Sequence, residues 1–315
     1  MEELTELTIN QLVKKSFSYE GCGNRLLIIH LQQQFNPLDN ILRKNLRDLG
    51  LRNNADSVLV ITGDPLKFLK QGYHVAMYVF EPRGVDSYNP DLFGSWSTMC
   101  GNGVRAVTRY LIDRGKLNCL IKTGSGTRQV SILSDNQFRV CMGKFTMEKK
   151  YLKKYIRDFN FHNLIPPQYR SGVKTIIAGL NGDASEDGAI DGEPHLAIFL
   201  PGKFHLNQLM YLAKVLGPAV TANRAVFPEC INTNFVVLGK RNGRNLTVNA
   251  CTFERGVTYV TKACGTGATV IGSYLLSKNP LLSKVNVRMP GGMLVIEQLE
   301  DQYYMTGPAN PLPET

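Results

Sequence analysis

The sequence lacks long hydrophobic runs, an export signal and any acidic excess, and each absence narrows the class of protein. Apolar runs such as Leu26–Ile29 and Ala197–Leu200 are far shorter than the roughly 20 residues that a membrane-spanning helix needs. The first residues carry Glu2, Glu3 and Glu6 instead of the basic and apolar regions of a signal peptide. We therefore expect a cytoplasmic protein with no membrane partner.

The seven cysteines form no Cys-x-x-Cys pair, and their odd number occurs in a chain without a predicted export signal. Disulfide frameworks are indicated by even numbers of cysteines, and zinc clusters by closely spaced pairs. No disulfide scaffold and no metal site are therefore predicted. Most of these thiols are expected to be small, buried, apolar side chains.

The composition is that of a globular protein with a basic balance. The 315 residues, 43% hydrophobic and 20% charged, suffice for one large core or two domains. Lys and Arg outnumber Asp and Glu by 36 to 26, partly through residues 149–157, which we expect to present an exposed basic face. No RNA- or DNA-binding motif accompanies this charge, so no nucleic-acid partner is predicted. The same field could attract an anionic substrate.

Two stretches far apart in the chain repeat one pattern that begins with a thiol. Cys-Gly-Asn-Gly at 100–103 and Cys-Gly-Thr-Gly at 264–267 are each followed, ten residues after the cysteine, by Tyr-Leu. A single motif of this kind is most often a buried cysteine beside a turn. Two copies in matched contexts indicate a duplicated unit, so Cys100 and Cys264 are the leading candidates for a function.

The same elements are predicted after each motif, in the same order. Apolar spacing predicts helices over 104–115 and 268–277. Each helix precedes two strand-like segments around a glycine-rich turn, at 120–133 and 285–298. Further strands are expected at 25–30, 57–62, 74–80, 195–200, 233–238 and 246–252, and a further helix at 206–216.

These patterns predict an α+β chain of two similar, pseudo-symmetric α/β halves. The expected bounds are residues 1–145 for the half with Cys100 and 146–302 for the half with Cys264. Residues 303–315 are expected to return to the first half. Duplicated domains usually face each other across a cleft, and ligands prefer such clefts, so we expect the active site there.

A thiol immediately before a helix is suited to acid–base chemistry. Backbone N–H groups without intrahelical partners, and the positive end of the helix dipole, favour its thiolate. The neighbouring glycines let a carboxylate approach the same N–H groups. Two such units supply a base on each side of one α-carbon, so that one thiolate removes the α-proton and the opposite thiol delivers another. No pyridoxal-phosphate site can be identified, and stereoinversion without a cofactor is expected.

Further segments accompany the two motifs in a fixed order. They are FSYEGCGNRLLIIH, NNADSVLVI, GEPH, LGPAV, FPECINTNFVV, ERG and the closing MTGPA. Together with MCGNGVRAVTRYL and ACGTGA, this series resembles the diaminopimelate epimerase family, the cofactor-independent two-cysteine epimerases of lysine and cell-wall biosynthesis. The resemblance covers nearly the whole chain, and the two cysteine motifs in one chain are very specific.

The resemblance implies roles for individual residues. Cys100 and Cys264 would be the catalytic acid/base pair. His195 and Glu254 would lie close to the thiols, to orient substrate or tune proton transfer, although a lone histidine is more often structural. The amides holding the α-carboxylate would belong to Gly101, Asn102, Gly265 and Thr266, and further substrate contacts to Asn24, Asn232 and Arg255.

The departures from the family pattern concentrate where relatives hold the rest of the substrate. The asparagines of the family's FNADGS and GNPH segments are Glu81 and Glu193 here, and its GADG-like segment ends in Ser57. Two carboxylates would repel a distal carboxylate and favour a cation. The substrate is therefore expected to be a free amino acid with a basic side chain, such as lysine, arginine, ornithine or histidine.

Other interpretations stay open. Glu81 and Glu193 could pair with Arg25, Arg83 or Arg255, and the substrate would then be diaminopimelate itself. A non-catalytic small-molecule-binding protein would keep its ligand affinity without the thiols. Phenazine-biosynthesis isomerases resemble the duplicated fold but lack the paired thiols, which argues against their chemistry here. The expected partner is a small amino acid, and a homodimer is compatible with the sequence.

Overall fold

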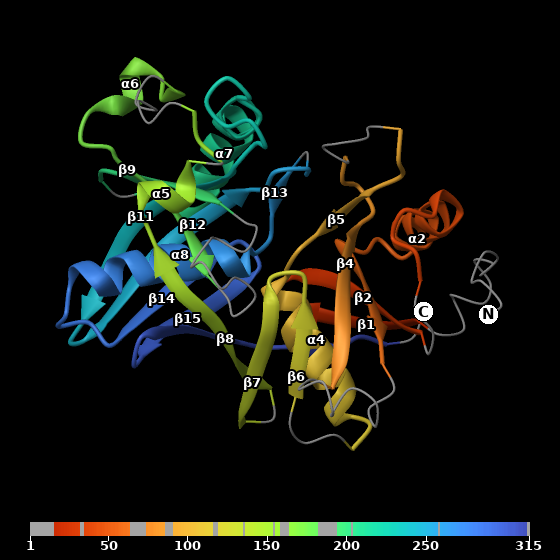
Figure 1. Ribbon diagram of the computed structural model, residues 1–315. Coiled ribbons are helices and arrows are strands. Elements are labelled where there is room, and N and C mark those ends of the chain that lie inside the picture. Colours follow the sequence, from red (N-terminus) through yellow and green to blue (C-terminus); the bar gives the residue numbers. More distant parts are fainter. Residues whose placement is uncertain are drawn as a thin grey trace. The chain divides into compact units, whose positions relative to one another are not determined.

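The computed structural model divides the chain into two compact units (Figure 1). Unit 1 comprises Met1–Val140 and Pro308–Thr315, and unit 2 comprises Cys141–Gly307. The predicted domain bounds at 145 and 302 stay a prediction. The structure describes residues 16–31, 35–63, 74–85, 91–115, 119–134, 136–153, 155–157, 164–181, 194–202, 204–257 and 259–313.

Unit 1 contains two parallel strand pairs, each joined by a segment that includes a helix. Strand β1 pairs antiparallel with β2, β2 parallel with β3, β3 antiparallel with β4, β4 parallel with β6, and β6 antiparallel with β7. The elements are β1 (Ser16–Gly21), β2 (Asn24–Leu31), α2 (Asn40–Arg52), β3 (Ser57–Thr62), β4 (Val75–Glu81), β5 (Ser95–Ser97), α4 (Gly101–Ile112), β6 (Cys119–Thr123), β7 (Gly126–Ser134), β8 (Gln137–Thr146, which continues into unit 2) and β17 (Asn310–Pro311).

Unit 2 repeats this series of pairings. Strand β9 pairs antiparallel with β10, β10 parallel with β11, β11 antiparallel with β12, β12 parallel with β14, and β14 antiparallel with β15. The elements are α5 (Lys149–Leu152), α6 (Pro167–Arg170), β9 (Lys174–Asn181), β10 (His195–Leu200), α7 (Leu206–Thr221), β11 (Asn232–Asn242), β12 (Asn245–Phe253), β13 (Val260–Thr261), α8 (Gly265–Lys278), β14 (Lys284–Met289), β15 (Gly292–Leu299) and β16 (Gln302–Gly307).

The matching pairings confirm the predicted α+β class and the two similar halves. Helices α2 and α7 occupy the same place in the two series, and so do α4 and α8. Helices are needed at these places because a parallel strand pair requires a long crossover. Each cysteine motif therefore lies at the start of the second crossover helix of its unit.

Most predicted elements are found, and the differences lie in the bounds of some helices and in short or partner-dependent elements. The strands predicted at 57–62 and 195–200 coincide with β3 and β10. Helices α4 and α8 begin three residues earlier than predicted, because the weakly helix-forming glycines of each motif make up the first turn. The elements that were not predicted are helices α2, α5 and α6 and strands β1, β5, β8, β9, β13, β16 and β17.

Each unit packs its first crossover helix on its sheet through an apolar core. In unit 1, Leu42, Leu46 and Leu49 of α2 pack with residues of β2 and β3, and Phe80 completes this cluster. In unit 2, α7 packs on β10 and β11, and the cluster is extended by Leu152, Tyr155, Ile156 and Ile165. The second crossover helices are more enclosed, since residues 101–108 of α4 are all buried. A helix buried this fully holds its N-terminal residues rigidly.

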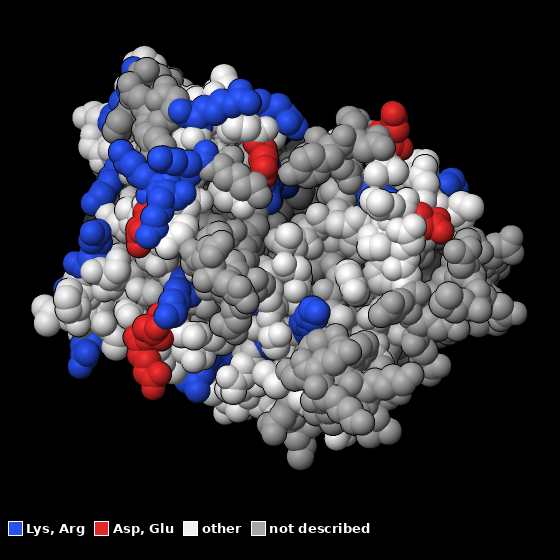
Figure 2. Space-filling view, viewed as in Figure 1, with Lys and Arg blue, Asp and Glu red and all other residues white. Residues whose placement is uncertain are grey.

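The described basic side chains of the stretch 149–157 are exposed on unit 2, as predicted. Figure 2 shows Lys and Arg side chains gathered over α5. Lys149 and Lys150 are exposed, whereas Leu152 and Ile156 are buried in the core. Lys150 forms an ion pair with Glu148, and both side chains are more than 60% exposed. Within the described ranges, no helix is both long and apolar enough to cross a membrane.

Candidate active site

Cys100 forms the N-cap of α4 in unit 1. Its backbone is extended, with φ −134° and ψ 110°, and its sulfur accepts a hydrogen bond from the Gly103 N–H at 3.3 Å. The thiol is partly exposed. A sulfur that accepts a helix N-terminal N–H, at the positive end of the helix dipole, is favoured as the thiolate. The local conditions predicted for Cys100 are therefore present.

Cys264 forms the corresponding N-cap of α8 in unit 2. Its backbone is again extended, with φ −114° and ψ 113°, and its sulfur accepts from the Gly267 N–H at 3.4 Å. This thiol is buried, with 4% of its surface exposed. The two motifs therefore adopt the same local structure, one in each unit.

A chain of hydrogen bonds extends behind Cys264. The Thr266 hydroxyl lies 3.4 Å from the Cys264 sulfur and 3.0 Å from Nε2 of His195, which is fully buried. On the other side of the ring, Nδ2 of Asn234 donates to His195 Nδ1 at 3.2 Å and to the Leu196 carbonyl at 3.1 Å. Thr252 donates to Oδ1 of the same amide at 2.8 Å.

This chain orients the imidazole of His195. Because the Asn234 amide group donates to Nδ1, that nitrogen is an acceptor, and the ring proton lies on Nε2 toward Thr266. Gly267 is required for the arrangement, since a Cβ there would lie 2.4 Å from the Asn234 oxygen. The histidine is thus a neutral donor, linked to Cys264 through one hydroxyl.

The motif of Cys100 is accompanied by a buried guanidinium, whereas the motif of Cys264 is accompanied by the hydrogen-bond chain through His195. Arg105 of α4 is fully buried and donates to the Asn102 side chain at 2.7 Å and to the Gly101 carbonyl at 3.3 Å. It also donates to the Pro308 carbonyl at 3.1 Å and, more distantly, to the Cys22 sulfur at 3.8 Å. These bonds hold the Asn102 side chain in place. They also place the positive charge of Arg105 next to Gly101 and Asn102, in the first turn of α4.

The strand register places two glutamates at equivalent positions in the two units. Val58 pairs with Phe80 in unit 1, as Thr233 pairs with Phe253 in unit 2. One step toward the strand ends, this register sets Ser57 beside Glu81 and Asn232 beside Glu254. The Ser57 hydroxyl donates to the Glu81 carboxylate, with distances of 3.2 and 3.1 Å to its two oxygens.

The predicted site residues of each unit gather at one edge of its sheet. Asn24 and Ser57 begin the parallel strands β2 and β3, and Glu81 ends the antiparallel β4. In unit 2, His195 and Asn232 begin β10 and β11 and are paired in register, and Glu254 follows β12. Asn232 accepts a hydrogen bond from the Arg255 N–H at 2.9 Å.

The structure gives the contacts of one arginine that was considered as a partner for the two glutamates, and it describes only one of those glutamates. Arg83, one proposed partner for the glutamates, donates to the Ala55 carbonyl at 2.7 Å and to the Asn54 side chain at 2.8 Å. Glu193 lies outside the described residues. Within those residues, no group of three or more His, Cys, Asp or Glu side chains could hold a metal ion.

Sequence reasoning assigned no role to Asn234, Thr252 or Arg105. A signal for Asn234 was available, because Asn232 and Asn234 lie two residues apart, on one face of β11, directly before the apolar run Phe235–Leu238. Arg105 lies five residues after Cys100, at a spacing that carries no charge in the second motif. Its burial is a property of the folded unit alone.

Comparison with known proteins indicates one family and one fold. A family model described as "Diaminopimelate epimerase" matches residues 189–312. A diaminopimelate epimerase of Agathobacter rectalis is 32% identical over 304 residues, which cover 92% of this chain and 94% of the relative.

Two solved structures are similar along almost the whole chain. A PhzF-family phenazine biosynthesis protein of Bacillus anthracis has a TM-score of 0.58 at 12% identity and covers 95% of this chain and 96% of its own. A hydroxyproline epimerase of Agrobacterium vitis, with bound trans-4-OH-L-proline, has a TM-score of 0.57 at 12% identity, and the match covers 95% of this chain and 90% of that one. At such identities the likeness shows the fold alone.

Proposed function

Since the chain belongs to the diaminopimelate epimerase family and is therefore an isomerase, we propose that it inverts the α-carbon of a free amino acid through the Cys100 and Cys264 thiols. The observation that carries the proposal is their identical local structure. Both cysteines are N-caps of equivalent helices in a duplicated fold, and both sulfurs accept an N–H of the first turn.

The proposed reaction is a proton exchange on two faces of one carbon. One thiolate takes the α-proton, and the electron pair left on carbon is delocalised toward the carboxylate. The opposite thiol then donates its proton, so that the thiol and thiolate exchange states. The amides of Gly101, Asn102, Gly265 and Thr266 are proposed to hold the carboxylate, because helix N-termini present N–H groups to anions.

His195 and Glu254 are proposed to act beside Cys264. The Nε2 proton of His195 points to Thr266, which in turn contacts the Cys264 sulfur. This arrangement supports the negative charge that appears on the sulfur when the thiol has donated its proton. Glu254 is proposed to bind the substrate ammonium, and Arg255, Asn232 and Asn24 to complete the contacts.

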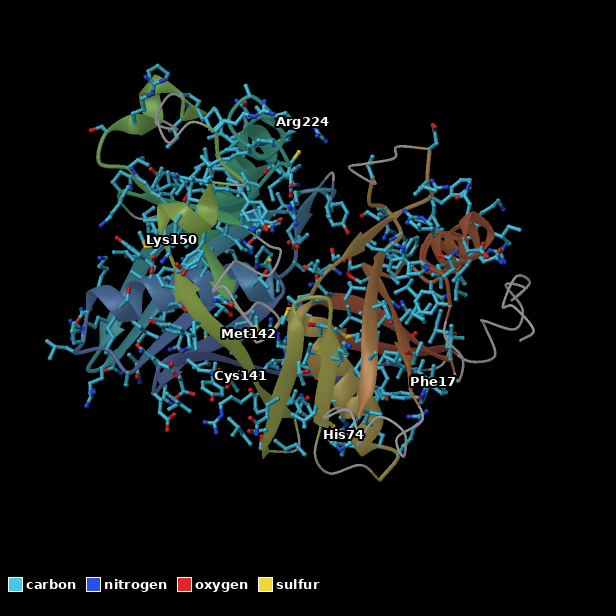
Figure 3. The ribbon with its side chains drawn as sticks, viewed as in Figure 1. Phe17, His74, Cys141, Met142, Lys150 and Arg224 are labelled. Atoms are coloured by element: carbon cyan, nitrogen blue, oxygen red, sulfur yellow. The ribbon has the colours of Figure 1, made fainter. Side chains whose placement is uncertain are left out.

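Cys100→Ser and Cys264→Ser should each lower racemisation by about 100-fold or more, because a hydroxyl is a far weaker acid than a thiol and is not ionised near neutral pH. The measurement is α-proton exchange with deuterated water together with the change in optical rotation. Cys141→Ser is the matched control, since Cys141 lies on β8 (Figure 3) and donates to Gln302 of β16. Near-normal racemisation by either active-site variant would overturn the two-thiol mechanism.

The substrate is proposed to have a basic side chain. The support is Glu81, a carboxylate at the position in unit 1 that corresponds to Glu254 in unit 2. Under the two-base geometry, the ammonium group and the side chain lie on opposite sides of the α-carbon. Equivalent carboxylates in the two halves would then bind one cation each. Ser57 orients the Glu81 carboxylate, and Glu193 would add further negative charge.

Among lysine, arginine, ornithine, histidine and diaminopimelate, kcat/KM should be highest for a basic amino acid. Glu81→Gln should lower it by about tenfold or more for that substrate, because a charge-assisted contact becomes neutral. Glu148→Gln, which removes an exposed carboxylate, is the control. If the enzyme converts only diaminopimelate, the proposal of a basic amino-acid substrate is wrong and the enzyme is a diaminopimelate epimerase. Ligand affinity that survives loss of both thiols, with no solvent exchange in the wild type, would indicate a binding protein.

A further inference from the structure

Unit 1 contains an apolar pocket whose described lining residues include none of the proposed active-site residues. Its volume is ≈ 360 Å³, within the range of about 300–1,000 Å³ that small-molecule sites occupy. The described residues around it are Pro37 and three segments, namely 76–79 in β4, 96–98 in and after β5, and 122–124 at the end of β6. The pocket is therefore a second candidate site in this unit.

The pocket opens where strand β4 changes partners (Figure 1). Strand β4 pairs with β6 at Val75 and Ala76, and with β5 over residues 79–81. The two partner strands therefore separate at Met77 and Tyr78, in the middle of β4. Both of these residues line the pocket.

In unit 2 the equivalent place is filled by a helix. Tyr78 lies two residues before Phe80, as Cys251 lies two residues before Phe253, and the strand registers make these pairs equivalent. Cys251 is fully buried in the cluster formed with α7. Helix α2 instead packs on β2, β3 and Phe80, and Tyr78 is 39% exposed. The apolar strand face that α7 covers in unit 2 is thus not covered by α2 in unit 1.

The aromatic side of the pocket is held in place by contacts within unit 1. The Trp96 indole N–H donates to the Pro37 carbonyl at 2.9 Å. The ring of Phe35 lies edge-on to Tyr78, with centroids 4.9 Å apart, and 5.8 Å from the ring of Trp96. Rings fixed in this way lose little side-chain freedom when a ligand packs against them, so an aromatic ligand is favoured.

The pocket has a positive charge at its lining. Among the described residues around it, Lys122 is the one with a charged side chain, and it is exposed. Ser97 adds a partly exposed hydroxyl that can donate to an anion. A carboxylate gains a charge-assisted contact here, whereas the cationic side chain of the proposed substrate would meet a like charge.

We propose that this pocket binds a small carboxylate with an aromatic body. The aromatic body packs against Tyr78 and Trp96, and the carboxylate pairs with Lys122. This ligand differs from the proposed substrate in its charge and in its place in unit 1. The inference therefore goes beyond the proposed function.

The test uses Trp96, the single tryptophan of the chain, as a reporter in the pocket. Its fluorescence is followed while the full-length protein is titrated with hydrocinnamate, with the uncharged hydrocinnamamide and with the cation phenethylamine. Hydrocinnamate should change the emission saturably. Hydrocinnamamide and phenethylamine should bind at least about tenfold more weakly, because they lack the charge-assisted contact.

Two variants locate the binding in the pocket. Lys122→Met should weaken hydrocinnamate binding by about tenfold and leave hydrocinnamamide binding unchanged. Lys44→Met is the matched control, since it removes an exposed ammonium of α2 that pairs with Asp48. Ala76→Phe should fill the pocket and abolish binding of both compounds, while racemisation stays near that of the wild type.

The inference is wrong if hydrocinnamate leaves the emission of the wild type unchanged, or if the acid and the amide bind equally. It is also wrong if the racemisation substrate displaces hydrocinnamate, because the pocket then belongs to the active site. Dimerisation that changes Trp96 emission and blocks hydrocinnamate would show that a second copy covers this face instead. The Lys122→Met reading stands even if Ala76→Phe fails to fold. None of these readings needs a thiol, so failure of the two-thiol function is a separate result.

Discussion

Asn234 shows how a single amide can prepare a proton donor. Its nitrogen donates to His195 Nδ1 and to the Leu196 carbonyl, and its oxygen accepts from Thr252. All three contacts are buried, so the amide cannot rotate without losing them. The tautomer of His195 follows from this orientation. Asn234, an uncharged residue, therefore determines that His195 donates its Nε2 proton toward Thr266.

Asn234→Ala should lower both stability and activity. The Thr252 hydroxyl and the Leu196 carbonyl would lose a buried partner, at a cost of about 1–3 kcal/mol in the free energy of unfolding. His195 would lose the donor that selects its tautomer, so kcat should fall more than the stability loss explains. Urea unfolding and racemisation of folded protein measure the two effects. Asn242→Ala, at the exposed end of β11, is the control, and unchanged kcat in folded Asn234→Ala would contradict this role.

At the scale of residues, the sequence identifies the candidate catalytic side chains but not the buried residues that hold them in position. Cys100, Cys264 and His195 stand out because their residue types and motifs are unusual. Asn234 and Arg105 have ordinary residue types, and their importance comes from burial and from partners distant in the chain. Local pattern cannot reveal such partners.

Helix α7 continues past a point where its sequence predicts an end. The predicted helix stops at 216, two residues before Pro218, which removes one backbone N–H. The structure continues the helix to Thr221, and the Ala222 N–H donates to the Pro218 carbonyl. Packing explains the extension, because Gly217 lies directly against Phe253 and Val220 is buried in the core.

Gly217→Ala should destabilise unit 2, although alanine is the better helix former. The gain in helix propensity is about 1 kcal/mol. The added Cβ would lie 2.6 to 2.7 Å from three atoms of Phe253, and overpacking of this kind costs about 1–3 kcal/mol. We expect a lower thermal midpoint. Val215→Ala, at an exposed position of the same helix, should change it little. A higher midpoint for Gly217→Ala would show that the ring moves freely.

Helix α2 was not predicted, although the sequence contains a helical pattern at this place. Leu42, Leu46 and Leu49 recur at helical spacing, and Asp39 caps the N-terminus by accepting from the Ile41 and Leu42 N–H groups. Charged residues between the leucines dilute the apolar pattern. The elements that were predicted have a clear apolar periodicity or a sequence motif. Strands β8 and β9 have neither and form through their pairing with neighbouring strands.

At the scale of the whole molecule, the last residues of the chain complete unit 1. Strand β17 pairs with β1, and Leu312 donates to the Ser18 carbonyl. The Ala309 N–H donates to Asn136, and the Asn310 side chain donates to Glu20. The Pro308 carbonyl accepts from Arg105. Unit 1 therefore depends on a segment that follows all of unit 2.

Removing residues 308–315 should destabilise unit 1. Arg105 would lose a buried acceptor and β1 its partner, so the free energy of unfolding should fall by more than about 2 kcal/mol. Asn310→Ala loses the side-chain contacts and keeps the backbone pairing, so it should cost less. Urea unfolding followed by circular dichroism compares the two. A truncated protein as stable as Asn310→Ala would mean that the segment adds no stability of its own.

The sequence by itself determined the duplicated thiol motifs, the order of helices and strands around them and the family, because these are written in residues close together along the chain. Tertiary structure decided which groups support each thiol. The bond from Arg105 to Pro308 spans 203 residues, and that from Asn234 to His195 spans 39. Such contacts exist only after the strands pair. The motifs are therefore alike in sequence and in their helix caps, and the folded units surround them with different hydrogen-bond partners.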